Sequence, residues 1–90
     1  MRESFGIAAF RSRQQVMRFE NALRTSGIFA RIVTTPREVA MGCGLSVRFE
    51  LNDLHKVKSV LDRENPGNLI GLYLVEYEDN RPVISVIGRN

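Results

Sequence analysis

Two stretches of the chain carry apolar residues at the spacing of one helical face. The first opens at Ser12, which forms a capping-box pattern with Gln15, and ends at Gly27, the expected left-handed cap. The second opens with Asn52 as its cap and stops at residues 65–67, an Asn-Pro-Gly sequence. The apolar stripes consist of Val16, Phe19, Ala22 and Leu23 in the first stretch and of Leu54, Val57, Val60 and Leu61 in the second.

Five further stretches predict β-strands, because their apolar residues alternate or form short runs bounded by turn residues. These stretches cover residues 4–10, 28–35, 45–49, 69–77 and 83–87. The alternation is regular in the third stretch, which predicts Leu45, Val47 and Phe49 on the buried side. Ser46 and Arg48 are expected to face outward.

The order of these elements predicts an α+β fold, a ferredoxin-like β-α-β-β-α-β sandwich with an extra C-terminal strand. We expect a single domain over residues 1–90, with a core of residues 4–67 and an added C-terminal hairpin over residues 69–88. Both helices would cover one face of the sheet. The other face would remain exposed, and its apolar strand residues would suit a homodimer.

The composition is that of an ordinary globular chain, with 90 residues of which 43% are hydrophobic and 26% charged. No apolar run approaches the ~20 residues that span a bilayer, and the first residues are too polar for a signal peptide. The single cysteine, Cys43, cannot form an internal disulfide, which fits a reducing compartment. These features predict a cytoplasmic protein with no membrane partner.

Basic residues gather in the first half of the chain. Residues 1–48 hold eight Arg and three acidic residues, a balance of +5, whereas residues 49–90 hold five basic and seven acidic residues, a balance of −2. Arginine, with its planar guanidinium, suits oxyanions. Anionic partners and plain solvated charges both fit this distribution. A formal net charge of +3 without a Lys/Arg run disfavours nucleic acid as a partner.

The segment between the second and third predicted strands is where the sequence suggests chemistry. Pro36 ends the preceding strand, because proline cannot donate to a central ladder. Gly42 and Gly44 flank Cys43 on its two sides. Since glycine reaches backbone conformations closed to other residues, we expect an uncrowded thiol on which backbone N–H groups can converge.

A reactive cysteine also needs positive charge nearby, because the thiolate is the nucleophile. Arg37 lies in the same segment as Cys43, and Arg31 and Arg48 lie on the flanking strands. We expect these guanidinium groups near the sulfur. The competing interpretation is an inert cysteine that packs as a small hydrophobe.

Other chemical signals are weak. His55 is the only histidine, and it has no cysteine at metal-ligand spacing, so we predict neither a metal site nor a cofactor. No acid/base pair supports a conventional enzyme. The sequence therefore gives no residue pattern that is typical of a conventional enzyme.

A longer pattern surrounds the cysteine. A helix ends in Leu-x-x-x-Gly-Ile, a strand follows, and then come Pro-Arg-Glu-hydrophobic, three residues, Cys-Gly-hydrophobic and another strand. The matching residues are Leu23, Gly27, Ile28, Pro36, Arg37, Glu38, Val39, Cys43, Gly44 and Leu45, continued by Arg48, Phe49, Asp53, Leu54, Val57 and Leu61. Over roughly residues 5–65 the chain resembles the small bacterial proteins grouped as Putative Se/S carrier protein-like.

The resemblance implies a carrier that holds sulfur or selenium on Cys43 as a persulfide or selenopersulfide, with Pro36, Arg37 and Gly44 as motif neighbours. It implies donor or acceptor proteins as partners. The binding residues predicted around the thiol are Arg37, Gly42, Gly44, Pro36 and Arg48. The alternative is a non-enzymatic ferredoxin-like binding or regulatory module for a small anion or a partner protein. The chain continues past the pattern into the 69–88 hairpin, whose role the resemblance does not cover.

Overall fold

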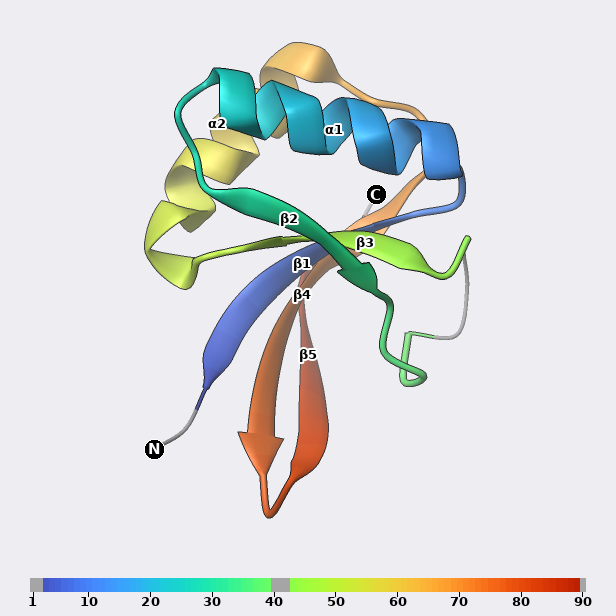
Figure 1. The fold of residues 1–90 in the computed structure, drawn as a ribbon, viewed down its shortest axis with the longest axis vertical. Coiled ribbons are helices and arrows are strands. Elements are labelled where there is room, and N and C mark those ends of the chain that lie inside the picture. Colours follow the sequence, from blue (N-terminus) through green and yellow to red (C-terminus); the bar gives the residue numbers. More distant parts are fainter. Residues whose placement is uncertain (1–2, 40–42, 90) are drawn as a thin grey trace.

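The computed structural model describes residues 3–39 and 43–89. Within these residues the chain forms five strands, two α-helices and a short 3-10 turn, in the order β-α-β-β-α-β-β (Figure 1). The strands are β1 (Ser4–Phe10), β2 (Ala30–Thr34), β3 (Leu45–Phe49), β4 (Leu69–Glu78) and β5 (Arg81–Arg89). The helices are α1 (Arg13–Thr25) and α2 (Leu54–Glu64), and the 3-10 turn Leu51–Asp53 precedes α2.

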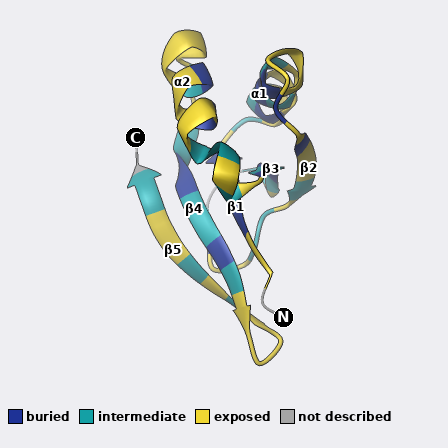
Figure 2. Ribbon diagram, turned by 90° about the vertical axis from the view of Figure 1, so that its left-hand side faces the viewer, coloured by how far each residue is buried: buried dark blue, intermediate teal, exposed yellow. Residues whose placement is uncertain are grey.

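The five strands form one antiparallel sheet with the order β2-β3-β1-β4-β5. The central strand β1 pairs with β3 on one side and with β4 along its whole length on the other. Both helices lie on the same side of this sheet (Figures 1 and 2). The predicted α+β class is therefore confirmed.

The main core lies between the helices and the sheet. It is built from the buried stripes of the two helices and from strand residues that alternate toward them. The ring centroids of Phe10 and Phe19 lie 5.5 Å apart, joining the end of β1 to the middle of α1. The buried residues of this main core are Ala8, Phe10, Val16, Phe19, Leu23, Ile28, Ala30, Val47, Phe49, Val57, Val60 and Leu72.

The face of the sheet away from the helices was expected to be exposed, but part of it is buried. Phe5, Ile7 and Val75 form a second buried cluster there. Val33, Tyr73 and Ile84 pack around it from β2, β4 and β5. The added strand β5 therefore contributes Ile84 to a cluster that β1, β2 and β4 also build. Figure 2 shows exposed residues at the tip of the β4–β5 hairpin and, alternating with half-buried ones, along β5.

The helix starts differ from the predicted caps. Ser12 is the N-cap of α1, yet in the described structure its hydroxyl makes no capping hydrogen bond, so the expected capping box is not formed. The second helix begins at Leu54 with Asp53 as its N-cap, so the prediction of Asn52 as the cap is wrong. The 3-10 turn occupies the position of the expected first turn and changes where the α-helical hydrogen bonds begin. Both predicted ends are confirmed, since Gly27 and Asn65 have φ of 80° and 44°.

The turn between β4 and β5 has fewer residues than the five, 78–82, that the predicted strands left between them. Asp79 and Asn80 both have positive φ, 51° and 66°, and they alone separate β4 from β5. Two left-handed residues are typical of a type I′ turn, which matches the twist of the flanking strands. Pro82 therefore lies within β5, and β5 extends beyond the predicted residues 83–87 at both ends.

Candidate functional site

The segment that follows β2 is fastened to β3 at its base. The backbone N–H of Thr35 donates to the carbonyl of Gly44 at 2.9 Å. The hydroxyls of Thr35 and Ser46 are joined by a hydrogen bond of 2.7 Å. Val39 is buried, and its N–H donates to the carbonyl of Pro36 at 2.9 Å, which closes a turn. The two ends of the segment are thus held together, and Cys43 lies just before the second of them.

Cys43 is half-buried and is a free thiol. Its side chain packs against the helix-side core, and its Sγ lies 3.6 Å from the carbonyl oxygen of Leu45, to which the thiol donates. Its backbone N–H donates to the carbonyl of Phe10 at 3.3 Å. The sulfur is therefore less open than two neighbouring glycines suggested, and one side of it rests on the core.

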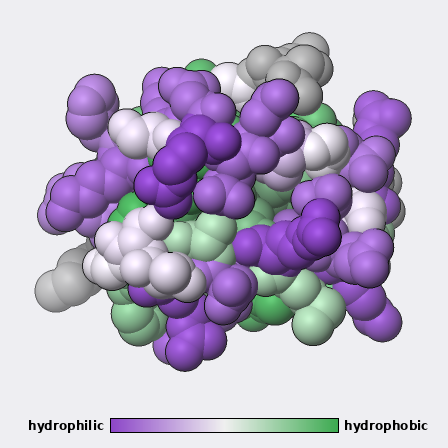
Figure 3. Space-filling view, turned by 90° about the horizontal axis from the view of Figure 1, so that it is seen from above, coloured by the Kyte–Doolittle hydropathy of each residue, from purple (hydrophilic) through white to green (hydrophobic). Residues whose placement is uncertain are grey.

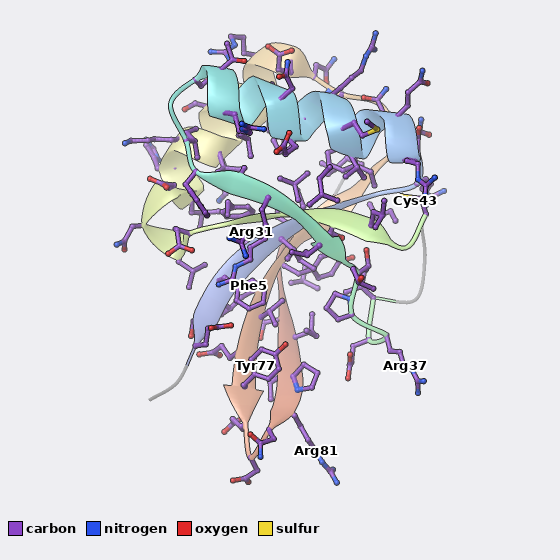
Figure 4. The ribbon with its side chains drawn as sticks, viewed as in Figure 1. Phe5, Arg31, Arg37, Cys43, Tyr77 and Arg81 are labelled. Atoms are coloured by element: carbon purple, nitrogen blue, oxygen red, sulfur yellow. The ribbon has the colours of Figure 1, made fainter. Side chains whose placement is uncertain are left out.

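The position of Cys43 is close to the start of α1. Phe10 ends β1, and the helix begins three residues later at Arg13, so the contact with Phe10 places the cysteine beside the β1–α1 connection (Figure 4). The first turn of α1 contains no acidic residue in the described structure. A helix start carries a partial positive charge from its unpaired N–H groups. The backbone of Cys43 thus lies beside the connection that leads into α1, while its sulfur faces the carbonyl oxygen of Leu45.

Gly44 is the glycine whose conformation the segment requires. Its φ is +86°, a region that other residues reach only with strain, and no atom lies within 4 Å of where a Cβ would stand. The strain on a substituted residue would therefore come from the backbone rather than from a clash. Gly42, the other predicted glycine, lies outside the described residues.

The predicted arginines are not gathered around the thiol. Arg37 is exposed and extends away from Cys43 in Figure 4. Arg48 places its guanidinium 3.9 Å from the centroid of the Phe5 ring and 3.6 Å from a Glu3 carboxylate oxygen. Within the described part of the chain, no ion pair or hydrogen bond joins a guanidinium to the sulfur. The expectation that arginines lie beside the thiol is thus not met.

The reason lies in which face of the sheet each side chain occupies. Arg31 and Arg48 are direct partners in the β2–β3 register, and Arg48 is also opposite Ile7 of β1. Ile7 belongs to the second cluster, on the face away from the helices. Cys43 packs against the helix-side core instead. The sheet therefore separates the thiol from both strand arginines.

A groove lies elsewhere on the helix side. It has a volume of about 640 Å³ and is formed by α1 together with the C-terminal end of α2. Figure 3, seen from the helix side, shows apolar surface at the bottom of a hollow with hydrophilic side chains around it. Its lining includes Arg18, Phe19 and Arg63 but not Cys43. Among residues 3–39 and 43–89, no three His, Cys, Asp or Glu side chains gather as a metal site.

Sequence reasoning missed the residues that hold this segment. Ser46 was expected to face solvent, but it is fully buried, and it anchors Thr35 through the hydroxyl pair. Phe10 supplies the backbone acceptor for Cys43. Alternation along a strand predicts which face of the sheet Ser46 takes, but it does not predict whether that face is buried.

A family model described as Putative Se/S carrier protein-like matches residues 5–73. The match covers most of the chain, from β1 into β4, and includes Cys43 and its surroundings. The chain therefore belongs to this family. Neither a curated protein nor a solved structure gives a significant match.

Proposed function

We propose that the protein is a sulfur or selenium carrier that holds the chalcogen on Cys43. The observation that carries this proposal is the position of the single cysteine, half-buried beside the start of α1, inside the segment that the family model matches. The partial positive charge of a helix start favours an anion. A persulfide carries its negative charge on the outer sulfur, the atom to be transferred.

The transfer step needs no cofactor. The thiolate of Cys43 attacks the outer sulfur of a persulfide on a donor protein. The sulfur–sulfur bond of the donor breaks as a new Sγ–S bond forms, and the donor leaves as a thiolate. In delivery, a thiolate of an acceptor attacks the outer sulfur of Cys43 persulfide, and Cys43 leaves as a thiolate. No net oxidation occurs, and selenium follows the same balance.

The other residues of the site take supporting roles in this proposal. Pro36 and Gly44 shape the segment that holds Cys43, and Gly42 is its other neighbour. Arg37, exposed and directed away from the thiol, contacts an anionic group of a partner protein rather than the sulfur. Arg48 acts from the opposite face only by supporting β3, the strand that follows Gly44.

Three broader assignments belong to the same proposal. We place the carrier in the cytoplasm, where the donor and acceptor proteins would act on it. The helices of the described part are too short or too polar to cross a membrane. We treat residues 1–90 as one domain, and the β1–β4 part as a ferredoxin-like sandwich to which β5 is added.

Mass spectrometry of the intact protein tests the proposal. Protein purified without reductant, or incubated with a persulfide donor enzyme and its substrate, should gain about 32 Da for one sulfur atom or about 79 Da for one selenium atom. A reductant should remove the added mass. The Cys43→Ser variant should gain nothing under either condition.

The rate of alkylation gives a second readout. Iodoacetamide should modify Cys43 in the folded protein at least as fast as in the urea-unfolded chain, because a carrier thiol must be accessible and ionised. A folded protein whose Cys43 is alkylated far more slowly than the unfolded chain, and which acquires no chalcogen from a donor, would contradict the carrier function.

A further inference from the structure

The strand β5 forms one border of the sheet. It pairs only with β4, and no described element lies beside its other side (Figure 2). It is nine residues long. Its central residues, 83–87, include neither a charged residue nor a proline, and Val83 and Val86 are exposed to 37% and 49%. Long, uncharged edges are avoided in monomeric proteins, because their unpaired backbone groups bind other strands.

The opposite border of the sheet shows the usual protection. The strand β2 has only five residues and carries Arg31 near its centre. A short strand with a charged residue is a poor template for another strand. The two edges of the same sheet therefore differ, because residues 83–86 of β5, between Pro82 and the register shift at Ile87, have no such protection.

The turn determines which backbone groups of β5 face this free edge. In a two-residue turn the flanking residues, Glu78 and Arg81, form the hydrogen-bonded pair. Hydrogen-bonded and non-hydrogen-bonded pairs then alternate along an antiparallel ladder. Pro82, Ile84 and Val86 consequently direct their backbone groups away from β4. Pro82 agrees with this phase, because a proline lacking an N–H would break the ladder if it faced β4.

The outward N–H and C=O groups of one β5 strand can pair with the same groups of a second, antiparallel β5 strand. An antiparallel pair of β5 strands related by a two-fold axis at Ser85 places Ile84 of one copy opposite Val86 of the other. Both residues present an outward N–H and an outward C=O, so both crossed pairs become hydrogen-bonded. Ile84 and Val86 also share the face away from the helices, since they pair with Val75 and Tyr73. Apolar cross-strand pairs of this kind stabilise a sheet.

We propose that two copies of the chain associate through β5, antiparallel and centred on Ser85, and so form one continuous sheet. The symmetric match of backbone groups and the uncharged central residues favour a second copy over a segment of another protein. A two-fold interface uses the same surface on both copies. Cys43 takes no part in this contact, so the dimer is independent of the carrier function.

Analytical ultracentrifugation of the full chain tests the dimer. The wild-type protein should show a mass of twice 10.2 kDa that falls to 10.2 kDa on dilution. Val86→Lys should be monomeric at concentrations where the wild type is dimeric, because it places charge on the proposed interface. The control is Ile32→Lys on β2, where an aliphatic residue with a similar exposed fraction, 38%, lies on the other edge and outside the interface. Circular dichroism checks that both variants fold.

Three results would overturn the proposal: a wild-type protein that remains a monomer at every concentration, a Val86→Lys variant that still dimerises, and loss of the dimer in Ile32→Lys. A wild-type protein that is always a monomer would mean that the free edge of β5 does not pair with a second copy, and a strand of a different protein would become the candidate partner. The persulfide assay is unaffected by any of them, so this proposal and the carrier function fail separately.

A cross-link tests the register directly and does not depend on the folding of Val86→Lys. Ser85 faces Ser85 of the other copy as a non-hydrogen-bonded pair, for which the Cα atoms lie about 4.5 Å apart. This separation falls within the range of disulfides. In a Cys43→Ser background, Ser85→Cys should form a covalent dimer with oxidised glutathione, whereas Ser59→Cys on the exposed side of α2 should not. Equal cross-linking of the two variants would contradict the register.

Discussion

At the scale of single residues, the candidate site depends on the conformation of Gly44 and on two hydroxyls. Gly44 combines a positive φ with a carbonyl that accepts the N–H of Thr35, so its backbone turns the chain back toward β3 just after Cys43. The Thr35–Ser46 hydrogen bond fastens the same place. The backbone next to Cys43 is therefore held in place by hydrogen bonds, and the N–H of Cys43 itself donates to the carbonyl of Phe10. The backbone of Cys43 is thus held by these neighbours, and its side chain is held by the helix-side core and the carbonyl of Leu45.

Replacing Gly44 with alanine tests this dependence. Gly44→Ala should lower the free energy of unfolding by about 1–2 kcal/mol, the cost of a left-handed L-residue. It should also change the rate at which iodoacetamide alkylates Cys43. Gly27→Ala is the matched control, because Gly27 has a φ of +80° and equally open space around its Cα. The control should lose similar stability, measured by urea unfolding, and leave the alkylation rate unchanged.

Equal alkylation rates in the two alanine variants would show that Gly44 does not position the thiol. A Gly44→Ala variant as stable as the wild type would contradict the positive φ itself.

At the scale of elements, β2 and β3 bring two like charges together. Arg31 and Arg48 are opposite one another in the register. Arg48 is compensated by Glu3 and by the Phe5 ring, whereas Arg31 has only the Phe29 ring, 5.7 Å away, among the described contacts. Like charges directly opposite each other destabilise a strand pair. Arg48 also stabilises the fold by covering Phe5. Arg31 is therefore the residue of the pair whose removal should relieve the repulsion without losing a stabilising contact of this kind.

Reversing the charge of Arg31 should therefore stabilise the protein. Arg31→Glu is expected to raise the free energy of unfolding by about 0.2–1 kcal/mol, since it replaces repulsion across the strands by attraction. Urea unfolding at low salt measures the change. The same substitution in an Arg48→Gln background is the control, and most of the gain should vanish there. A gain of the same size without Arg48 would mean that the cross-strand pair is not the cause.

At the scale of the whole molecule, the C-terminal hairpin is part of both clusters. Val75 of β4 belongs to the second cluster and Ile84 of β5 packs against it. Leu72 and Ile87 reach the helix-side core from the same two strands. The hairpin therefore shares its buried surface with the part of the chain that the family model matches, and it should not unfold separately.

Unfolding should consequently be a single cooperative transition. Both tyrosines, Tyr73 and Tyr77, lie on β4, so tyrosine fluorescence reports on the hairpin. Far-UV circular dichroism reports mainly on α1 and α2. The two signals should give the same midpoint in urea, as two-state unfolding requires. An earlier midpoint for fluorescence would show that the hairpin is an independently unfolding unit.

Much of the fold could be predicted from the sequence, because local patterns carry it. The apolar stripe of α1, the left-handed cap at Gly27 and the alternation of β3 are set by neighbours a few residues apart. The family resemblance also depended on residues close in sequence, from Leu23 to Leu45, and it is confirmed. The identity of the candidate thiol, Cys43, follows from its being the only cysteine.

Tertiary structure alone decided what surrounds that thiol. The sequence placed Arg31 and Arg48 near Cys43, but strand pairing turns those side chains to the face away from the helices while the cysteine packs on the helix side. Burial of Ser46 and the contact of Cys43 with Phe10 likewise join residues that are distant along the chain. Local periodicity fixes which face a residue takes relative to its neighbours, whereas what covers each face depends on the register and on segments far away in sequence.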